Sequence, residues 1–186
     1  MLRDGWKTAV SLYYEGRTGN PFSWVYSSDL NGDGRSDNDT VAVPSGPDDP
    51  RFDFSGMSNA TAYLAFIGNS DLSAYAGGVA PKNAFTEPWV NRLDLKFSQE
   101  IPVYASAKLE LFLDFINFGA FVSEDFFGYV DRTSRLSNDV FRTRQLGGAR
   151  YGSDGRIQPT FGTPDQFVTD NVQSRWRIQL GARLSF

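Results

Sequence analysis

Side chains that carry oxygen ligands are concentrated in one segment, and their spacing is that of a calcium-binding loop. Asp29, Asn31 and Asp33, followed by a glycine, form the D-x-N-x-D-G start of such a loop, and Asp37 falls at its ninth position. Calcium takes six to eight oxygen ligands, so these four side chains would supply part of its shell. The sequence therefore offers calcium as the one candidate cofactor.

The same segment departs from the full calcium pattern. The twelfth position, where a bidentate glutamate is usual, is Thr40, and Asp39 stands one residue too early. The carbonyl of Arg35 could add one further oxygen. The alternative interpretation is a tight turn of aspartate, asparagine and glycine residues in a surface loop.

Most catalytic chemistry lacks its residues here. The chain has no histidine and no cysteine, which excludes Ser-His-Asp and Cys-His nucleophiles, zinc sites built on those residues, and disulfides. The acidic pairs Asp48-Asp49 and Glu124-Asp125 have the groups of a glycosidase, but neighbouring loop acids are usually solvated. A net charge of -4 gives no basic surface for nucleic acid. We expect neither an enzyme nor a nucleic-acid partner.

The elements that must position such residues are β-strands, and the clearest is the last one. From Arg175 to Phe186 apolar and polar residues alternate without exception. A period of two predicts a strand with one apolar and one polar face. Such a strand fits a membrane-spanning sheet, and it also fits the half-buried edge of a soluble sandwich.

The final residues of this strand, QLGARLSF, resemble the C-terminal assembly signal of bacterial outer-membrane barrels. The residues that carry the resemblance are Gln179, Gly181, Leu184 and the terminal aromatic Phe186. The resemblance implies that the barrel assembly machinery is a partner and that these four residues serve recognition during assembly.

Three further segments show the same alternation: Gly5–Arg17, Trp89–Ile101 and Ala107–Asn117. Together the four strands predict one antiparallel sheet whose apolar face carries Leu93, Leu95, Phe97, Leu109, Leu111, Leu113, Trp176, Ile178, Leu180 and Leu184. The opposite face would carry Arg92, Asp94, Lys96, Glu110, Asp114, Arg177 and Arg183. These charges cannot fill a dry core without a heavy desolvation cost, so they must face water or a polar filling. Both the lumen of a wide barrel and the solvent side of a soluble sheet satisfy this requirement.

The connections between these strands are unequal. A five-residue turn, Pro102–Ser106, joins the second and third strands, whereas 18–88 and 119–172 form two long connections. Short turns at one end and long loops at the other are typical of outer-membrane barrels. Within the long connections the sequence predicts a helix near Ser58–Ile67, ending at Gly68, and a hairpin with its turn at Gly152–Gly155.

With these segments in view, the chain resembles the C-terminal part of an Oar-like TonB-dependent receptor. The likeness is carried by SWVYSSDLNGDGRSDNDTVAVP, EPWVNRLDLKFSQEIP, KLELFLDFINFG and SRWRIQLGARLSF, in that order along the chain. It implies an all-β fold in which residues 1–186 supply about four membrane strands and two extracellular loops of a barrel of about 22 strands.

The resemblance also implies a location and partners. The barrel would lie in the outer membrane of a Gram-negative bacterium, in contact with its lipid, and would take up or export a ligand with energy from the TonB complex. That complex would act through N-terminal parts outside these 186 residues. The export signal and the plug would also lie in those parts. Four strands cannot close a barrel by themselves, so the segment would be an incomplete one.

Two other classes of protein remain open. One is a soluble, β-rich module that binds carbohydrate with the help of calcium. The other is a trimeric autotransporter anchor, in which three chains contribute four strands each, although such anchors have short loops.

Overall fold

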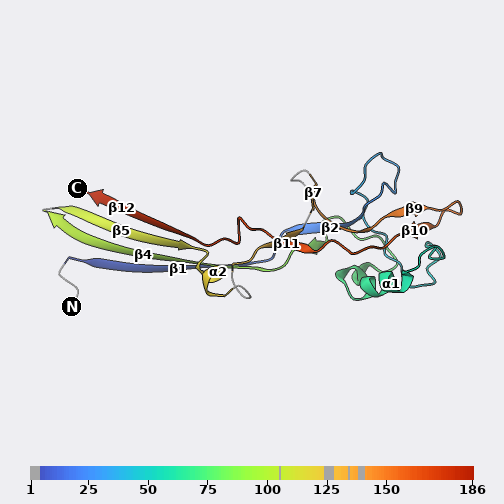
Figure 1. Cartoon of the computed structure of the whole chain (residues 1–186), viewed down its shortest axis with the longest axis horizontal. Coiled ribbons are helices and arrows are strands. Elements are labelled where there is room, and N and C mark those ends of the chain that lie inside the picture. The colour runs from blue at the N-terminus through green and yellow to red at the C-terminus, as the bar shows by residue number, and fades with distance from the viewer. Residues whose placement is uncertain (1–4, 105, 124–127, 134, 138–140) are drawn as a thin grey trace. The chain divides into compact units, whose positions relative to one another are not determined.

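The computed structural model describes residues 5–104, 106–123, 128–133, 135–137 and 141–186. They form a predominantly β structure with mainly antiparallel sheets. The chain divides into two compact units, each assembled from separate stretches (Figure 1). The first unit comprises Met1–Gly19, Pro88–Asp131 and Thr169–Phe186, and the second comprises Asn20–Glu87 and Arg132–Val168.

The first unit is built on a four-stranded antiparallel sheet in the order β1-β4-β5-β12. Its strands are β1 (Lys7–Arg17), β4 (Val90–Tyr104), β5 (Ala107–Ile116) and β12 (Arg177–Ser185), and a short helix, α2 (Phe118–Val122), follows β5. All four strands lie where the alternation predicts them. The predicted pairings of β4 with β5 and of β5 with β12 are confirmed, and β1 and β12 are the outer strands.

The turn between β4 and β5 is shorter than predicted. The expected turn covers Pro102–Ser106, but β4 continues through Tyr104 and β5 begins at Ala107. Pro102 lies opposite Lys108, next to a register irregularity before Tyr104. A bulge is one of the few places where a strand accepts proline, which has no N–H to donate. The prediction is wrong because it treats this proline as the end of the strand.

The register confirms the predicted faces. Residues paired directly across antiparallel strands have their side chains on the same side of the sheet. Leu95 pairs with Phe115, which pairs in turn with Ile178, and Lys96 pairs with Asp114. Every predicted apolar residue within these paired strands therefore lies on one face, and every predicted charged residue on the other.

The two long connections do not remain separate loops: most of their residues, Asn20–Glu87 and Arg132–Val168, fold together into the second unit. Strand β2 (Pro21–Tyr26), from the first connection, runs parallel to β8 (Phe141–Gly147), from the second. They form the sheet β3-β2-β8-β7, completed by β3 (Phe85–Thr86) and β7 (Arg135–Ser137). Residues 22–26 of β2 are all buried, so its sequence shows no alternation. This explains why the strand was not predicted.

The remaining elements include those that the sequence does predict. Helix α1 (Ala60–Gly68) ends at the predicted glycine, and the hairpin of β9 (Ala149–Tyr151) and β10 (Ile157–Pro159) encloses the predicted turn. A 3₁₀ helix, η1 (Asp71–Tyr75), follows α1, and two short strands, β6 (Asp131–Thr133) and β11 (Phe167–Thr169), pair with each other.

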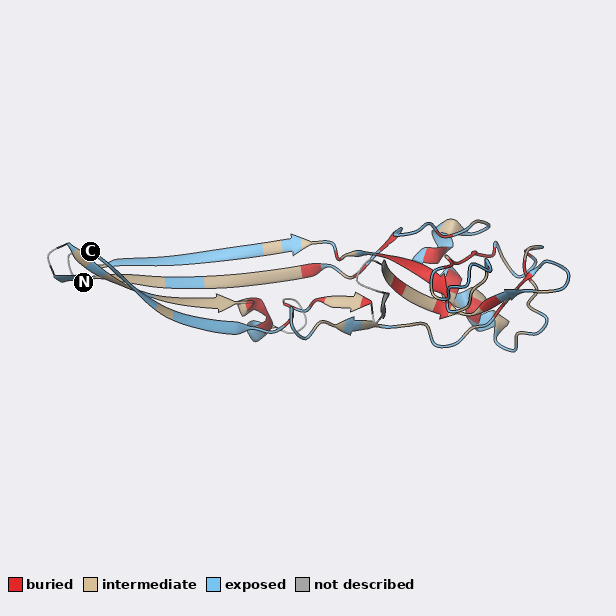
Figure 2. Ribbon diagram, turned by 90° about the horizontal axis from the view of Figure 1, so that it is seen from above, coloured by how far each residue is buried: buried red, intermediate tan, exposed pale blue. Residues whose placement is uncertain are grey.

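The second unit has its own aromatic core. Figure 2 shows buried residues gathered in this unit, while the long strands of the first unit are mostly exposed or intermediate. Tyr63 and Ile67, one turn apart on α1, both point into the core. Its other large members include Phe22, Trp24, Tyr26, Val41, Val43, Phe52, Leu72 and Leu146.

A buried carboxylate joins three separate segments of this unit. Oε1 of Glu87 accepts hydrogen bonds from the backbone N–H of Thr133, at 2.8 Å, and from Nη1 of Arg142, at 2.9 Å. Its Oε2 accepts a bond from the side-chain amide of Asn20 at 2.9 Å. A buried charge is tolerated only when it is paired in this way. Nothing in the sequence pattern singles out this glutamate.

Candidate functional site

One face of the four-stranded sheet is largely apolar and open to solvent; its polar members include Thr8, Asn91 and Gln99. Leu180 is 75% exposed, Leu12 and Val10 are each 65% exposed, and Leu184 is 51% exposed. Large exposed apolar patches mark interaction or membrane surfaces in soluble and membrane proteins alike. We call this surface the apolar face; it comprises Val10, Leu12, Tyr14, Leu93, Leu95, Phe97, Ile101, Leu109, Leu111, Leu113, Phe115, Ile178, Leu180, Ala182 and Leu184.

Aromatic rings are grouped at the end of the sheet where the long connections leave it. The ring of Phe115 lies 5.0 Å from that of Phe118, 5.4 Å from that of Phe121 and 5.8 Å from that of Trp176, measured between centroids. On the neighbouring strands, Tyr14 Oη and Trp89 Nε1 both donate hydrogen bonds to Oδ1 of Asn91. Phe121 and Trp89 remain more than half exposed.

The opposite end of the sheet also carries exposed aromatic residues. Tyr104, at the β4–β5 turn, is 83% exposed, and Phe186, just after β12, is 93% exposed. The apolar face is thus bounded at both ends by aromatic side chains. Trp176 and Phe186 are ten residues apart, or about 34 Å along the strand. With a strand tilt of about 40°, this corresponds to a height of about 26 Å, against an apolar band of about 25 Å in membrane barrels.

The other side of the sheet, which we call the polar face, carries a network of charges. Nζ of Lys96 lies 3.4 Å from Oδ1 of Asp114, and Nη1 of Arg183 lies 3.6 Å from Oε2 of Glu110. Both pairs join neighbouring strands. The face comprises Lys7, Glu15, Arg17, Arg92, Asp94, Lys96, Glu100, Lys108, Glu110, Asp114, Arg177 and Arg183. Its density of charge requires water or polar groups opposite it.

A phenylalanine on the polar face depends on Gly181. Phe112 lies opposite Gly181, and a Cβ atom added to this glycine would meet Cζ of the ring at 2.2 Å. The ring therefore occupies the space above the glycine, and Nζ of Lys96 lies 5.2 Å from the ring centroid on its other neighbouring strand. Phe112 interrupts the alternation in the sequence, and the missing side chain of Gly181 explains how it fits.

A buried asparagine fixes the chain where β5 ends. Asn117 has a left-handed backbone conformation, with φ of 55°, and its N–H donates to Oδ1 of Asp94 at 2.6 Å. Its side-chain amide donates to the carbonyls of Ser174, at 2.9 Å, and Gly128, at 3.1 Å. These bonds hold together three segments of the first unit next to the aromatic group. The alternation places Asn117 only as the last residue of a strand, although asparagine is one of the few residues besides glycine that adopt this left-handed backbone.

The predicted calcium ligands lie in one loop, but their oxygens accept hydrogen bonds from the backbone. The carboxylate of Asp29 accepts bonds from the N–H groups of Gly32 at 2.7 Å, Asp33 at 3.1 Å and Gly34 at 2.8 Å. Asn31 and Asp33 likewise accept backbone N–H groups, at 2.8 Å in each case.

Two other acids of this loop also have hydrogen-bond partners in the protein. Asp37 contacts the side chain of Gln145, and buried Asp39 accepts the N–H groups of Leu30, at 2.6 Å, and Asn31, at 3.1 Å. Within the described ranges, no group of three or more Asp, Glu, His or Cys side chains is arranged to hold a metal. The geometry is that of the Asx turn that the sequence offers as the alternative, and calcium binding stays a prediction.

The four residues of the proposed assembly signal occupy different environments. Gln179 lies on the polar face opposite Asp114, and Gly181 lies below the ring of Phe112. Leu184 lies on the apolar face opposite Leu109, and Phe186 follows the end of the strand. Their role in recognition remains a prediction.

Of the two acidic pairs, one contains a buried, hydrogen-bonded aspartate, and the other lies outside the described residues. Asp49 is buried and accepts hydrogen bonds from Ser45 and from Arg51, whose Nη2 lies 2.6 Å from Oδ2. The Arg51 guanidinium holds the pKa of Asp49 well below its usual range. The other pair, Glu124-Asp125, is not among the described residues.

No known protein family, curated protein or solved structure matches this chain. Among the helices that the structure describes, none is long and apolar enough to cross a membrane.

Proposed function

We propose that the four-stranded sheet is part of the wall of an outer-membrane β-barrel, with its apolar face toward lipid and its polar face toward an aqueous lumen. The observation that supports this is the open apolar face bounded at both ends by aromatic residues. Lipid-facing apolar bands flanked by aromatic girdles, with a polar interior, define such barrels. The span of about 26 Å estimated for β12 agrees with the thickness of that band.

The energetics of the apolar face favour lipid over water. Six of its aliphatic side chains, Val10, Leu12, Leu111, Ile178, Leu180 and Leu184, are at least 44% exposed. Full burial of one such side chain is worth about 1.5–3 kcal/mol. Because these six side chains are about half exposed, their transfer together into lipid would stabilise the sheet by about 5–10 kcal/mol.

The outer edges of the sheet call for further strands. No strand among the described residues pairs with the outer edge of β1 or of β12. Unpaired backbone groups in lipid cost several kcal/mol each, so a membrane sheet must close on itself. The chain resembles Oar-like TonB-dependent receptors, and in such a receptor the rest of the plugged barrel would contain the partner strands. The receptor would import or export a ligand with energy from the TonB complex.

The topology of the connections agrees with this orientation. Arg17 pairs with Val90, and Ile116 with Arg177, so both long connections leave the sheet at the same end. The β4–β5 turn and Phe186 are at the other end. In the proposed barrel, the end with the long connections faces the outside of the cell, and the end with Phe186 faces the periplasm.

Two adjacent substitutions on β12 test the proposed faces. Leu180→Arg places a charge on the apolar face midway between Trp176 and Phe186, whereas Gln179→Arg places the same charge on the polar face. Each substitution is made in a complete receptor barrel, because the sheet alone would leave two unpaired edges in lipid; the fraction bound to lipid vesicles is measured by flotation. At mid-bilayer an arginine costs about 2–4 kcal/mol, so Leu180→Arg should weaken membrane binding by at least tenfold.

The control variant, Gln179→Arg, should bind like the wild type because its side chain faces water. Equal loss of binding in both variants would contradict the assignment of faces. A wild-type chain that stays monodisperse in water without detergent, and does not float with vesicles, would favour the soluble carbohydrate-binding module.

A further inference from the structure

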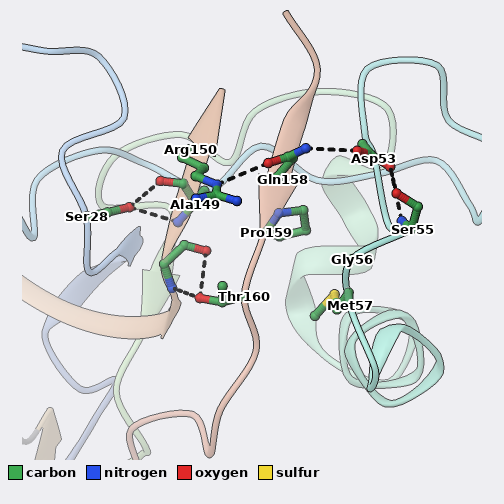
Figure 3. A pocket seen from close by; sticks show the side chains of 11 residues that line it. Ser28, Asp53, Ser55, Gly56, Met57, Ala149, Arg150, Gln158, Pro159 and Thr160 are labelled. Carbon is green, nitrogen blue, oxygen red and sulfur yellow. Dashed lines mark hydrogen bonds between the residues drawn. The ribbon is translucent and has the colours of Figure 1, made fainter. Parts of the chain in front are cut away.

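The second unit contains a pocket beside the β9–β10 hairpin (Figure 3). Its volume of about 540 Å³ lies within the range of small-molecule sites. Hydrogen-bonding side chains form a row across the pocket in Figure 3, with Pro159 and Met57 below them. The row consists of Ser28, Arg150, Gln158, Asp53 and Ser55.

Four members of this row hold one another in place, and the fifth, Ser28, is bonded to the backbone of Ala149. Nε of Arg150 donates to Oε1 of Gln158 at 3.1 Å, and Nε2 of Gln158 donates to Oδ2 of Asp53 at 2.9 Å. Oδ1 of Asp53 accepts bonds from the backbone N–H of Ser55 at 3.0 Å and its hydroxyl at 2.7 Å. The bonds from Ser55 and Gln158 lower the pKa of Asp53 to about 2. The row therefore presents one fixed cation and one fixed anion at neutral pH.

The row retains hydrogen-bonding capacity for a ligand. Arg150 is exposed, and its two terminal nitrogens make no hydrogen bond within the part of the chain that the structure describes. A guanidinium presents such nitrogens as a planar fork that matches a carboxylate. Asp53 has about four acceptor positions, of which three are used by Ser55 and Gln158. The fourth could accept an N–H group.

The remaining wall is apolar and small. Met57 and Pro159 contribute apolar surface, and Gly56 and Gly148 have no side chains to fill the space. An unbranched methionine adapts to apolar groups of different shape. The pocket thus combines a carboxylate-binding fork, an N–H acceptor and an apolar wall within one small volume.

We propose that this pocket binds a ligand that carries a carboxylate next to an apolar group, as a peptide does at its C-terminus. The carboxylate would bind Arg150, the apolar group would lie against Met57 and Pro159, and an amide N–H would donate to Asp53. All of these residues belong to the second unit. The inference therefore does not depend on the proposed membrane role of the sheet.

Two probes that differ only in charge test the fork. Calorimetric titration of the full chain in detergent compares N-acetyl-L-leucine with N-acetyl-L-leucinamide. The acid should bind at least about tenfold more tightly than the amide, because charge-assisted bonds to a guanidinium are the stronger ones. Arg150→Gln should abolish this preference, and Arg150→Lys should retain part of it.

Arg35→Gln is the control, because it removes a positive charge from an exposed loop of the same unit, and Arg35 is not among the residues that line the pocket. Arg156 on the hairpin is unsuitable, since its Nη2 lies 3.9 Å from Oδ1 of Asp53. Arg35→Gln should leave the affinity for the acid within about twofold of the wild-type value. Acetyl-Ala-Ala-Leu distinguishes the source of the ligand, since tighter binding than N-acetyl-leucine indicates a peptide and equal binding indicates a small organic acid. Failure of both acids to bind, or unchanged binding in Arg150→Gln, would overturn the proposal.

Discussion

Substitution of Gly181 by alanine should destabilise the sheet through one identified contact. The added Cβ would lie 2.2 Å from Cζ of Phe112 and 2.7 Å from two further ring atoms. Carbon atoms do not approach so closely, so the ring must leave its place above the glycine. It would then also lose its position near Nζ of Lys96, 5.2 Å from the ring centroid.

The change in stability is the sum of two destabilising contributions and one stabilising contribution. Overpacking of this kind costs about 1–3 kcal/mol. Loss of the exposed cation–π contact adds about 0.5–1 kcal/mol. Replacement of a strand glycine by alanine recovers about 0.5–1 kcal/mol of backbone entropy. The net destabilisation of β12 against β5 should therefore be about 1–3 kcal/mol.

Hydrogen exchange of peptides from β5 and β12, measured by mass spectrometry in detergent, reports this local stability. Exchange of the amides on these strands should accelerate about 5- to 140-fold in Gly181→Ala. In a Phe112→Ala background, the same Gly181→Ala change should be neutral or slightly protective, because the ring is gone. Equal acceleration in both backgrounds would show that the ring contact is not the cause and would refute the reasoning.

Three other predictions concern separate parts of the chain. In a full-length receptor, Phe186→Ala should lower the amount of receptor assembled in the outer membrane, measured by protease shaving, while ligand binding per assembled molecule stays normal; unchanged assembly would remove the signal role. In Asp49→Asn, the free energy of unfolding of the second unit should decrease less on acidification than in the wild type. The pKa of Asp49 is lowered in the folded state, so its contribution to stability is present above about pH 4 and is lost as pH falls below that value. Acid titrations of wild type and variant measure the difference. Asp29→Ala should lower the thermal stability of the second unit equally with calcium and with chelator, by about 1–2 kcal/mol, because Asp29 closes the loop through three backbone N–H groups; an effect seen only with calcium would instead identify Asp29 as a ligand.

The sheet of the first unit could be predicted because each of its strands carries apolar residues on one side and polar residues on the other. This difference produces the period-two alternation, which places the boundaries of β12 within two residues of Arg175 and Phe186. The parity of the connections then gives the strand order. Pro102 misled the prediction of the turn, since its place in a bulge depends on the partner strand and leaves no local signal.

The second unit could not be predicted in the same way. Strand β2 is buried on both sides, so no alternation marks it, and its parallel partner β8 lies more than a hundred residues away in the sequence. The pocket proposed above was missed for a similar reason. Asp53, Arg150 and Gln158 are unremarkable separately, and only the folding of one connection against the other brings them together.

The calcium loop illustrates the limit of a local motif. The spacing of Asp29, Asn31 and Asp33 suits a metal, but the same spacing lets these side chains accept backbone N–H groups of their own loop. Sequence alone cannot separate the two uses, because both require short oxygen-bearing side chains beside glycine.

The central claim, that the apolar face of the sheet contacts lipid, can be tested directly by a scan along β12. The chain has no cysteine, so single cysteines at positions 177 to 185 can each carry an environment-sensitive fluorophore. With these residues inside a complete receptor barrel that carries no other cysteine, reconstituted in vesicles whose lipids have a quencher on the acyl chain, positions 178, 180, 182 and 184 should be quenched and the odd positions should not. Quenching without this alternation, or none at any position, would contradict the assignment of β12 to a membrane wall.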